Sequence, residues 1–102
     1  AKIPIEQLVG TIETLGEKGI KDEIAGTGLK KFFLTLQTGA DKTNPKIVGL
    51  STALENLRKK QMDATAIKKM FGEEGYNVAS VLINEADKVE YYTKAVTAHP
   101  SL

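Results

Sequence analysis

The sequence contains no cysteine, and its only histidine, His99, stands beside a proline near the end of the chain. Without cysteine there is no disulfide framework and no thiolate metal site. At that position His99 gives neither a metal cluster nor a Ser-His-Asp arrangement a plausible centre. The longest apolar runs, such as Phe32-Phe33-Leu34, are far shorter than the roughly 20 residues that span a bilayer. We therefore expect no enzymatic activity, no cofactor and no membrane span in this segment.

What the chain does contain is the composition of an ordinary folded domain. Of its 102 residues, 41% are hydrophobic and 26% are charged, which suffices for one small core that buries roughly two thirds of the unfolded surface. The formal net charge is only +1, whereas dedicated nucleic-acid binders usually carry a strong basic excess. The chain begins at Ala1 without a methionine. We expect residues 1–102 to be a single domain and a fragment of a much longer protein.

Apolar residues recur at steps of three and four along most of the chain, which is the spacing of one face of an α-helix. Pro4 suits a first helical turn, and the stripe that follows it stops at Gly16 and Gly19. Asp22 is the candidate N-cap of a second helix that ends at Thr38-Gly39. The first stripe comprises Ile5, Leu8, Val9, Ile12 and Leu15, and the second comprises Ile24, Ala25, Gly28, Leu29, Phe32, Phe33 and Leu36.

Two further helices are expected after the polar, turn-rich residues 38–46. Asn44-Pro45 has the pattern of an N-cap followed by proline at the first helical position. The cations of Arg58-Lys59-Lys60 suit the C-terminus of that helix. Asp63 is the candidate cap of a short helix that ends at Phe71-Gly72. The stripe of the first of these helices comprises Ile47, Leu50, Ala53, Leu54 and Leu57.

Residues 76–83 are nearly all apolar, which has two interpretations. The segment suits a helix that is buried on most sides, and its Val-Leu-Ile run also suits a buried strand. Asn84 is then the candidate cap of a last helix through Val96. Because no other segment has the alternating polarity of a partner strand, we predict an all-α fold, a compact bundle of about five to six short helices. We expect its core to include Leu29, Phe32, Leu36, Leu54, Leu57, Phe71, Leu82 and Val89.

The clearest ligand-like pattern is Gly26-Thr27-Gly28 with Lys30-Lys31, which superficially resembles a phosphate-binding loop. Such a loop follows a strand and binds phosphate through free backbone N–H groups. Here the glycines lie inside a helical stripe, where each costs roughly 1 kcal/mol relative to alanine. We therefore interpret Gly26 and Gly28 as positions of close helix packing.

Charged residues give two more candidate sites. Glu73-Glu74, with Asp87 and Glu90 downstream, offers paired carboxylates for acid–base hydrolysis. Glutamates that follow a capping glycine also suit the start of the next helix, and we favour that interpretation. The candidate interaction surface is basic and comprises Arg58, Lys59, Lys60, Lys68 and Lys69. Because this cluster lacks interleaved aromatic residues for base stacking, we expect DNA contact to be weak at most.

Four blocks of sequence carry a resemblance to a known family. They are Ala25-Gly26-Thr27-Gly28-Leu29, Asn44-Pro45 with Val48-Gly49-Leu50, Phe71-Gly72-Glu73-Glu74, and Leu82-Ile83 with Asp87-Lys88-Val89. No block is specific alone, but their order and spacing resemble the conserved region of phage tail tape-measure (minor tail) proteins. The match covers nearly the whole chain, from Ile5 to Thr97. Its structural-motif residues are Gly26, Gly28, Pro45, Phe71 and Gly72.

The resemblance implies a structural module of a phage or prophage tail protein that acts in virion assembly and sets tail length. The implied partners are tail-tube, baseplate or tail-assembly chaperone proteins, with self-association through this piece left open. The implied location is the virion tail, after synthesis in the bacterial host cytoplasm. Two alternatives remain: a helical protein-binding adaptor or effector domain, and part of a peptidoglycan-degrading tail protein.

Overall fold

The computed structural model describes residues 5–20 and 22–98, and the expectations for Pro4 and His99 lie outside these ranges. Within them the chain forms six α-helices, one 3-10 turn and no strand. The all-α prediction is confirmed, and the alternative of a strand at residues 78–83 is wrong. The elements are α1 (Ile5–Glu17), α2 (Asp22–Gln37), η1 (Asp41–Thr43), α3 (Pro45–Val48), α4 (Leu50–Lys59), α5 (Ala64–Asn84) and α6 (Ala86–Ala98).

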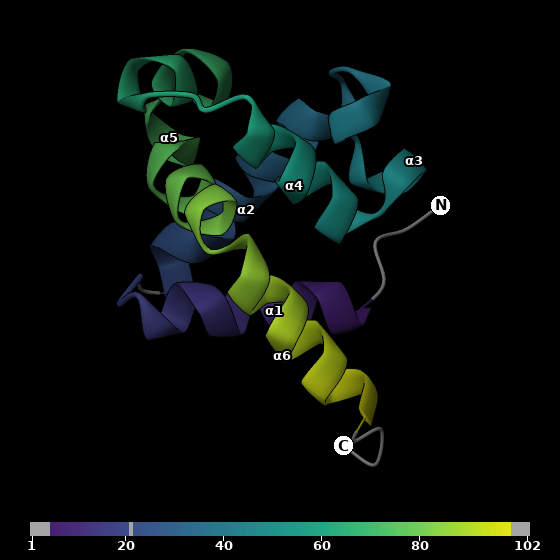
Figure 1. The fold of residues 1–102 in the computed structure, drawn as a ribbon. Coiled ribbons are helices and arrows are strands. Elements are labelled where there is room, and N and C mark those ends of the chain that lie inside the picture. Colours follow the sequence, from purple (N-terminus) through teal and green to yellow (C-terminus); the bar gives the residue numbers. More distant parts are fainter. Residues whose placement is uncertain (1–4, 21, 99–102) are drawn as a thin grey trace.

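The helices pack as two crossed pairs joined by α4. Helix α1 packs mainly on α6 and α2 mainly on α5, while α4 touches both α5 and α6. Figure 1 shows α1 and α6 crossing on one side of the molecule, with α3 and α4 beside the α2–α5 pair. The radius of gyration is 12.7 Å, close to the roughly 13 Å of a compact chain of this length. The short helices thus form a compact bundle.

The core centres on the crossing of α2 and α5. The rings of Phe32 and Phe71 stack there, with centroids 5.2 Å apart and planes inclined by 20°. Seven of the eight residues predicted for the core are buried, and Leu29 is partly buried against it. The seven buried ones are Phe32, Leu36, Leu54, Leu57, Phe71, Leu82 and Val89.

The two glycines of the phosphate-loop-like pattern have different surroundings. A Cβ atom on Gly28 would overlap the side chain of Val78 and would lie 3.3 Å from the carbonyl oxygen of Glu74. The absence of a side chain at Gly28 is therefore what lets α2 and α5 approach each other. Gly26 is exposed, and a Cβ there would meet no atom within 4 Å. The packing interpretation is correct for Gly28 and wrong for Gly26.

Helix α1 buries Leu15 of its predicted apolar stripe but not Ile12. Ile12 is 51% exposed, whereas Thr11 and Thr14 are fully buried. Their hydroxyls donate to carbonyl oxygens of their own helix, Thr11 to Leu8 and Thr14 to Gly10, so neither is left unsatisfied. A Cβ on Gly10 would overlap Thr93 of α6. Small and threonine side chains, not the apolar stripe alone, thus bring α1 against α6.

Two predicted caps are confirmed at helix starts. The Asn44 side chain accepts a hydrogen bond from the Lys46 N–H at 2.9 Å, with Pro45 at the first position of α3. The Asp63 side chain accepts from the Ala66 N–H at 2.8 Å at the start of α5. Each satisfies an N–H that has no partner inside its helix. The side chain of Asp22 lies outside the described part of the chain, although α2 begins at that residue.

One predicted boundary is confirmed and two are wrong. The predicted break at Gly72 is confirmed, because Gly72 leaves the helical conformation (φ 76°, ψ 175°) and divides α5 into two helical segments across a kink. The helix expected from Pro45 onward is divided by Gly49, whose φ of 85° ends α3 and precedes α4. Asn84 is the last residue of α5 and does not cap α6.

Replacing Phe71 with alanine tests the central stack. Phe71 is fully buried against Phe32, so Phe71→Ala should lower the free energy of unfolding by about 3–5 kcal/mol. Chemical denaturation followed by circular dichroism measures this loss. Tyr91, which is 67% exposed, gives the control, and Tyr91→Ala should cost less than about 0.5 kcal/mol. A loss below about 1 kcal/mol for Phe71→Ala would show that it is not a core residue.

The glycine pair of α2 gives a matched test of helix packing. Gly28→Ala should lower the melting temperature, because its added methyl overlaps Val78. Gly26→Ala adds the same methyl in open space and should stabilise the protein by about 0.5–1 kcal/mol through helix propensity. Thermal denaturation compares the two variants. Equal shifts of the same sign would contradict the close approach of α2 and α5.

Candidate interaction site

The five predicted basic residues occupy three different settings. Arg58 in the last turn of α4 places Nη1 3.6 Å from Oδ2 of Asp87 on α6. Lys68 on α5 places Nζ 5.0 Å from the centroid of the Tyr76 ring, a distance that suits a cation–π contact. Lys59 and Lys60 line an open hollow beside η1. Lys69 is exposed on α5. The structure therefore divides the predicted surface, and only Lys59 and Lys60 share a concave site.

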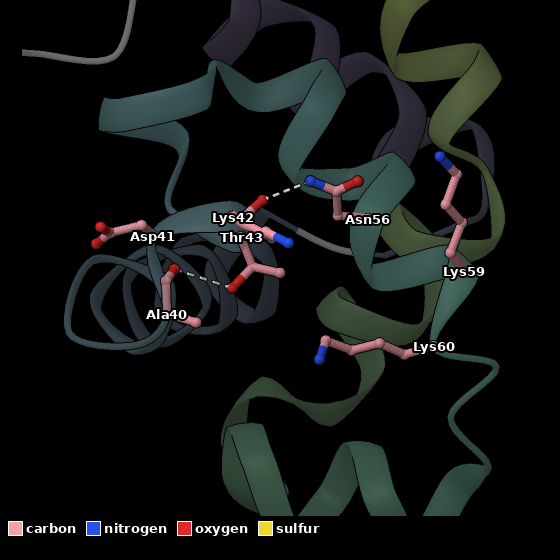
Figure 2. A pocket seen from close by; sticks show the side chains of 7 residues that line it. All are labelled: Ala40, Asp41, Lys42, Thr43, Asn56, Lys59 and Lys60. Carbon is pink, nitrogen blue, oxygen red and sulfur yellow. Dashed lines mark hydrogen bonds between the residues drawn. The ribbon is translucent and has the colours of Figure 1, made fainter.

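This hollow, called the lysine hollow below, lies between the η1 turn and the outer face of α4 (Figure 2). Its volume is about 520 Å³. The Asn56 side chain donates a 2.7 Å hydrogen bond to the carbonyl oxygen of Lys42 and so fixes η1 against α4. Figure 2 shows Lys60 extending toward the side where Ala40 and Thr43 lie, while Lys59 turns away from them. The lining residues are Ala40, Asp41, Lys42, Thr43, Asn56, Lys59 and Lys60.

Three lysines and one aspartate line the lysine hollow, although the Lys59 ammonium group turns away from Ala40 and Thr43 (Figure 2). Lys42, Lys59 and Lys60 supply the positive charges and Asp41 supplies the negative one. All four side chains are exposed, so each ion pair with a ligand would be weakened by solvent and salt. Such a site suits the acidic side chains of a protein partner, which several weak contacts hold together.

Part of this site was recognisable in the sequence. Asn56, Lys59 and Lys60 lie at i, i+3 and i+4, which places them on one face of a helix. The basic pattern predicted Lys59 and Lys60 as interaction residues but gave no signal for Asn56. Lys42 has no such signal, because a loop brings it to α4 and the contact through Asn56 spans 14 residues.

The carboxylates proposed as an alternative acid–base pair do not gather in one hollow. Glu73 and Glu74 lie on α5 beside α2. Asp87 pairs with Arg58, and Glu90 pairs with Lys94 at 2.9 Å within α6. In the described ranges, no group of three or more His, Cys, Asp or Glu residues is arranged to hold a metal ion. Of the helices described, none is long and apolar enough to cross a membrane.

A second charged cluster joins the end of α1 to the beginning of α6. The Glu17 carboxylate accepts hydrogen bonds from Lys88 Nζ and from the Tyr92 hydroxyl, both at 2.5 Å. Lys18 Nζ lies 2.8 Å from Oε1 of Glu85. Each helix end thus contributes both signs of charge, so this cluster is a link between helices and not a ligand site.

These contacts shift the pKa values of the groups that make them. The hydrogen bonds from Lys88 and Tyr92 lower the pKa of Glu17, and the hydrogen bond from Lys18 lowers the pKa of Glu85. The hydrogen bond to Glu17 raises the pKa of Lys88 and also that of Tyr92. The carboxylates of Glu17 and Glu85 and the ammonium group of Lys88 are therefore held in their charged forms.

The Glu17 cluster should make stability depend on pH in the acid range. Because folding lowers the pKa values of Glu17 and Glu85, their contribution is present above the unfolded value of 4.5 and is lost as the pH falls through the folded values. Glu17→Gln should therefore lower the urea midpoint at pH 7, and this difference from the parent should shrink toward zero in acid. High salt should also reduce it.

The matched control for the Glu17 cluster is Glu90→Gln. This change removes the pair with Lys94 inside α6 and leaves the link between helices intact. A urea midpoint that is equal for Glu17→Gln and the parent at pH 7 would show that the cluster contributes nothing to folding.

The lysine hollow and the described helices are the basis for assigning a role to this domain. No family model, no curated protein and no solved structure matches the chain. Its role is therefore proposed from the order of its sequence blocks and from the surfaces that the bundle leaves exposed.

Proposed function

We propose that this domain is a structural module of a phage or prophage tail tape-measure protein and acts in tail assembly and tail-length determination. The observation that carries the proposal is the order of its four sequence blocks. Such a block does not need to bind a ligand, because packing also restricts which residues fit at the contacts between helices.

Three of the four blocks supply such joints. Gly28 of the first block lies where α2 meets Val78 of α5. Asn44 of the second block caps α3. Phe71 of the third block stacks on Phe32. These residues contribute to helix packing and capping. They therefore support the interpretation that the resemblance reflects a common helical bundle with a structural role.

The shape of the domain favours docking over measuring length. A single straight helix of 102 residues would extend about 150 Å at 1.5 Å per residue. The bundle is 41 Å along its longest axis, so it contributes little length for its number of residues. Within a tape-measure protein, we assign such a segment to contacts with tail-tube, baseplate or tail-assembly chaperone proteins in the virion tail.

The lysine hollow is the surface assigned to that contact. Its three lysines suit an acidic segment of one of these partners, and its exposure leaves DNA binding weak and sensitive to salt. A helical adaptor or effector would use the same hollow for an unrelated partner. The two roles differ in what is lost when the hollow is changed.

A phage that encodes the domain allows a direct test. Lys42→Glu with Lys60→Glu reverses the charge of the hollow on exposed side chains and should leave the fold intact. We expect fewer or misassembled tails with normal heads, counted by electron microscopy. The matched control is Lys68→Glu with Lys69→Glu, which changes two exposed lysines outside the hollow.

The core variant Phe71→Ala separates the hollow from the domain as a whole. If the domain acts in assembly, this variant should reproduce the tail defect, because unfolding removes every surface at once. Normal numbers of normal tails after deletion of the whole domain, apart from proportionate shortening, would contradict an assembly role.

A further inference from the structure

A groove runs along the seam between α2 and the second half of α5. Two adjoining hollows of about 370 and 380 Å³ form it, and both are lined by Thr27 and Glu74. Ile24 lies in the first hollow and Leu34 in the second. These two side chains are 51% and 56% exposed, so the groove has a large apolar side chain toward each end.

The exposed face of α2 has a regular spacing. Ile24, Thr27, Lys31 and Leu34 are separated by three, four and three residues, which aligns them along one side of the helix. This side borders the one that carries Gly28 and packs on α5. Ile24 and Leu34 are separated by ten residues, or about 15 Å along the axis.

The charges of the groove are ordered by sign. The hollow at Ile24 is lined by three carboxylates, those of Glu23, Glu73 and Glu74. The hollow at Leu34 is lined by the ammonium groups of Lys30 and Lys31, with Glu74 on the boundary. The groove therefore has an acidic end at the hollow with Ile24 and a basic end at the hollow with Leu34, whose two lysines lie at the middle of α2.

We infer that this groove binds a second copy of the chain, with the two α2 helices antiparallel about a two-fold axis. In that arrangement Ile24 of each copy faces Leu34 of the other. Lys31 of each copy faces Thr27 of the other, which lines the acidic hollow with Glu74. A two-fold interface needs a patch that is complementary to itself, and this order of charges meets that requirement. A parallel arrangement would place like charges together, which is repulsive.

The stem of Lys31 explains how a charged residue belongs to this face. A Cβ on Gly75 would lie 3.1 Å from Cγ of Lys31, and one on Gly72 would lie 3.6 Å from Cε. The aliphatic stem thus covers the glycine surface at the bend of α5 while the ammonium group remains at the groove. This inference does not depend on the proposed tail function.

Sedimentation equilibrium of the 102-residue chain tests the inference. We expect a reversible monomer–dimer equilibrium that weakens as salt is raised. Ile24→Gln and Leu34→Gln should each raise the dimer Kd at least about tenfold, because each removes an apolar contact twice in a symmetric pair. The matched control is Ile12→Gln on α1, which is also 51% exposed and lies outside the groove.

Charge reversal distinguishes this dimer from any other. Lys30→Glu with Lys31→Glu makes both ends acidic, and Glu73→Lys with Glu74→Lys adds positive charge to the acidic end. Each double variant should be monomeric alone, and an equimolar mixture should form the heterodimer. Circular dichroism and melting temperature verify that each variant is folded.

Three outcomes would overturn the inference. A parent chain that is monomeric at every concentration would contradict the dimer, and the groove would then suit a different partner. A dimer that Ile24→Gln and Leu34→Gln do not weaken would use another surface. Folded charge variants that are monomeric alone but do not associate when mixed would contradict the antiparallel pairing.

Discussion

The close approach of α2 and α5 is the constraint on which the rest of this bundle depends. Gly28 lets Val78 come within contact of the α2 backbone, and one turn further on Phe32 stacks on Phe71. Fixing Gly28 and Phe32 inward turns Leu34, two residues after Phe32, outward. The same contact thus forms the core and leaves Leu34 exposed.

The two crossed pairs use different chemistry to achieve similar closeness. Helices α2 and α5 combine one glycine with a pair of stacked phenylalanine rings. Helices α1 and α6 combine Gly10 with buried threonines whose hydroxyls bond within their own helix. Exposed ion pairs at Glu17 and Glu85 then fix the end of the second pair. Because exposed ion pairs contribute little each, packing at Gly10 determines this crossing more than charge does.

The sequence predicted what depends on local pattern. The helical class follows from apolar spacing, and the caps at Asn44 and Asp63 follow from side chains that satisfy N–H groups nearby. The buried face of α1 was predicted only in part, because apolar spacing favours Ile12 and gives no weight to Gly10 or Thr14. Gly10 is buried against Thr93 of α6, which is distant in the sequence.

Helix boundaries and the candidate site were predicted only in part, for a related reason. Gly49 and Gly72 both take positive φ and both interrupt a helix, but only the break at Gly72 was predicted. The apolar spacing from Ile47 to Leu57 continues across Gly49, so no local pattern marks the break there. In the site, Lys59 and Lys60 lie on a predictable helix face, whereas Lys42 reaches them only through the loop that Asn56 holds.

The two exposed surfaces differ in the kind of partner they suit. The lysine hollow carries mainly positive charge. Two lysine hollows would therefore repel each other, whereas an acidic partner would be attracted. The α2 groove carries both signs in order, which a reversed copy matches. A pair formed through the grooves would present two lysine hollows, and a partner with two acidic segments would then bind the second at a high effective concentration. Weak exposed charges in each hollow would become adequate for stable docking once they act in pairs.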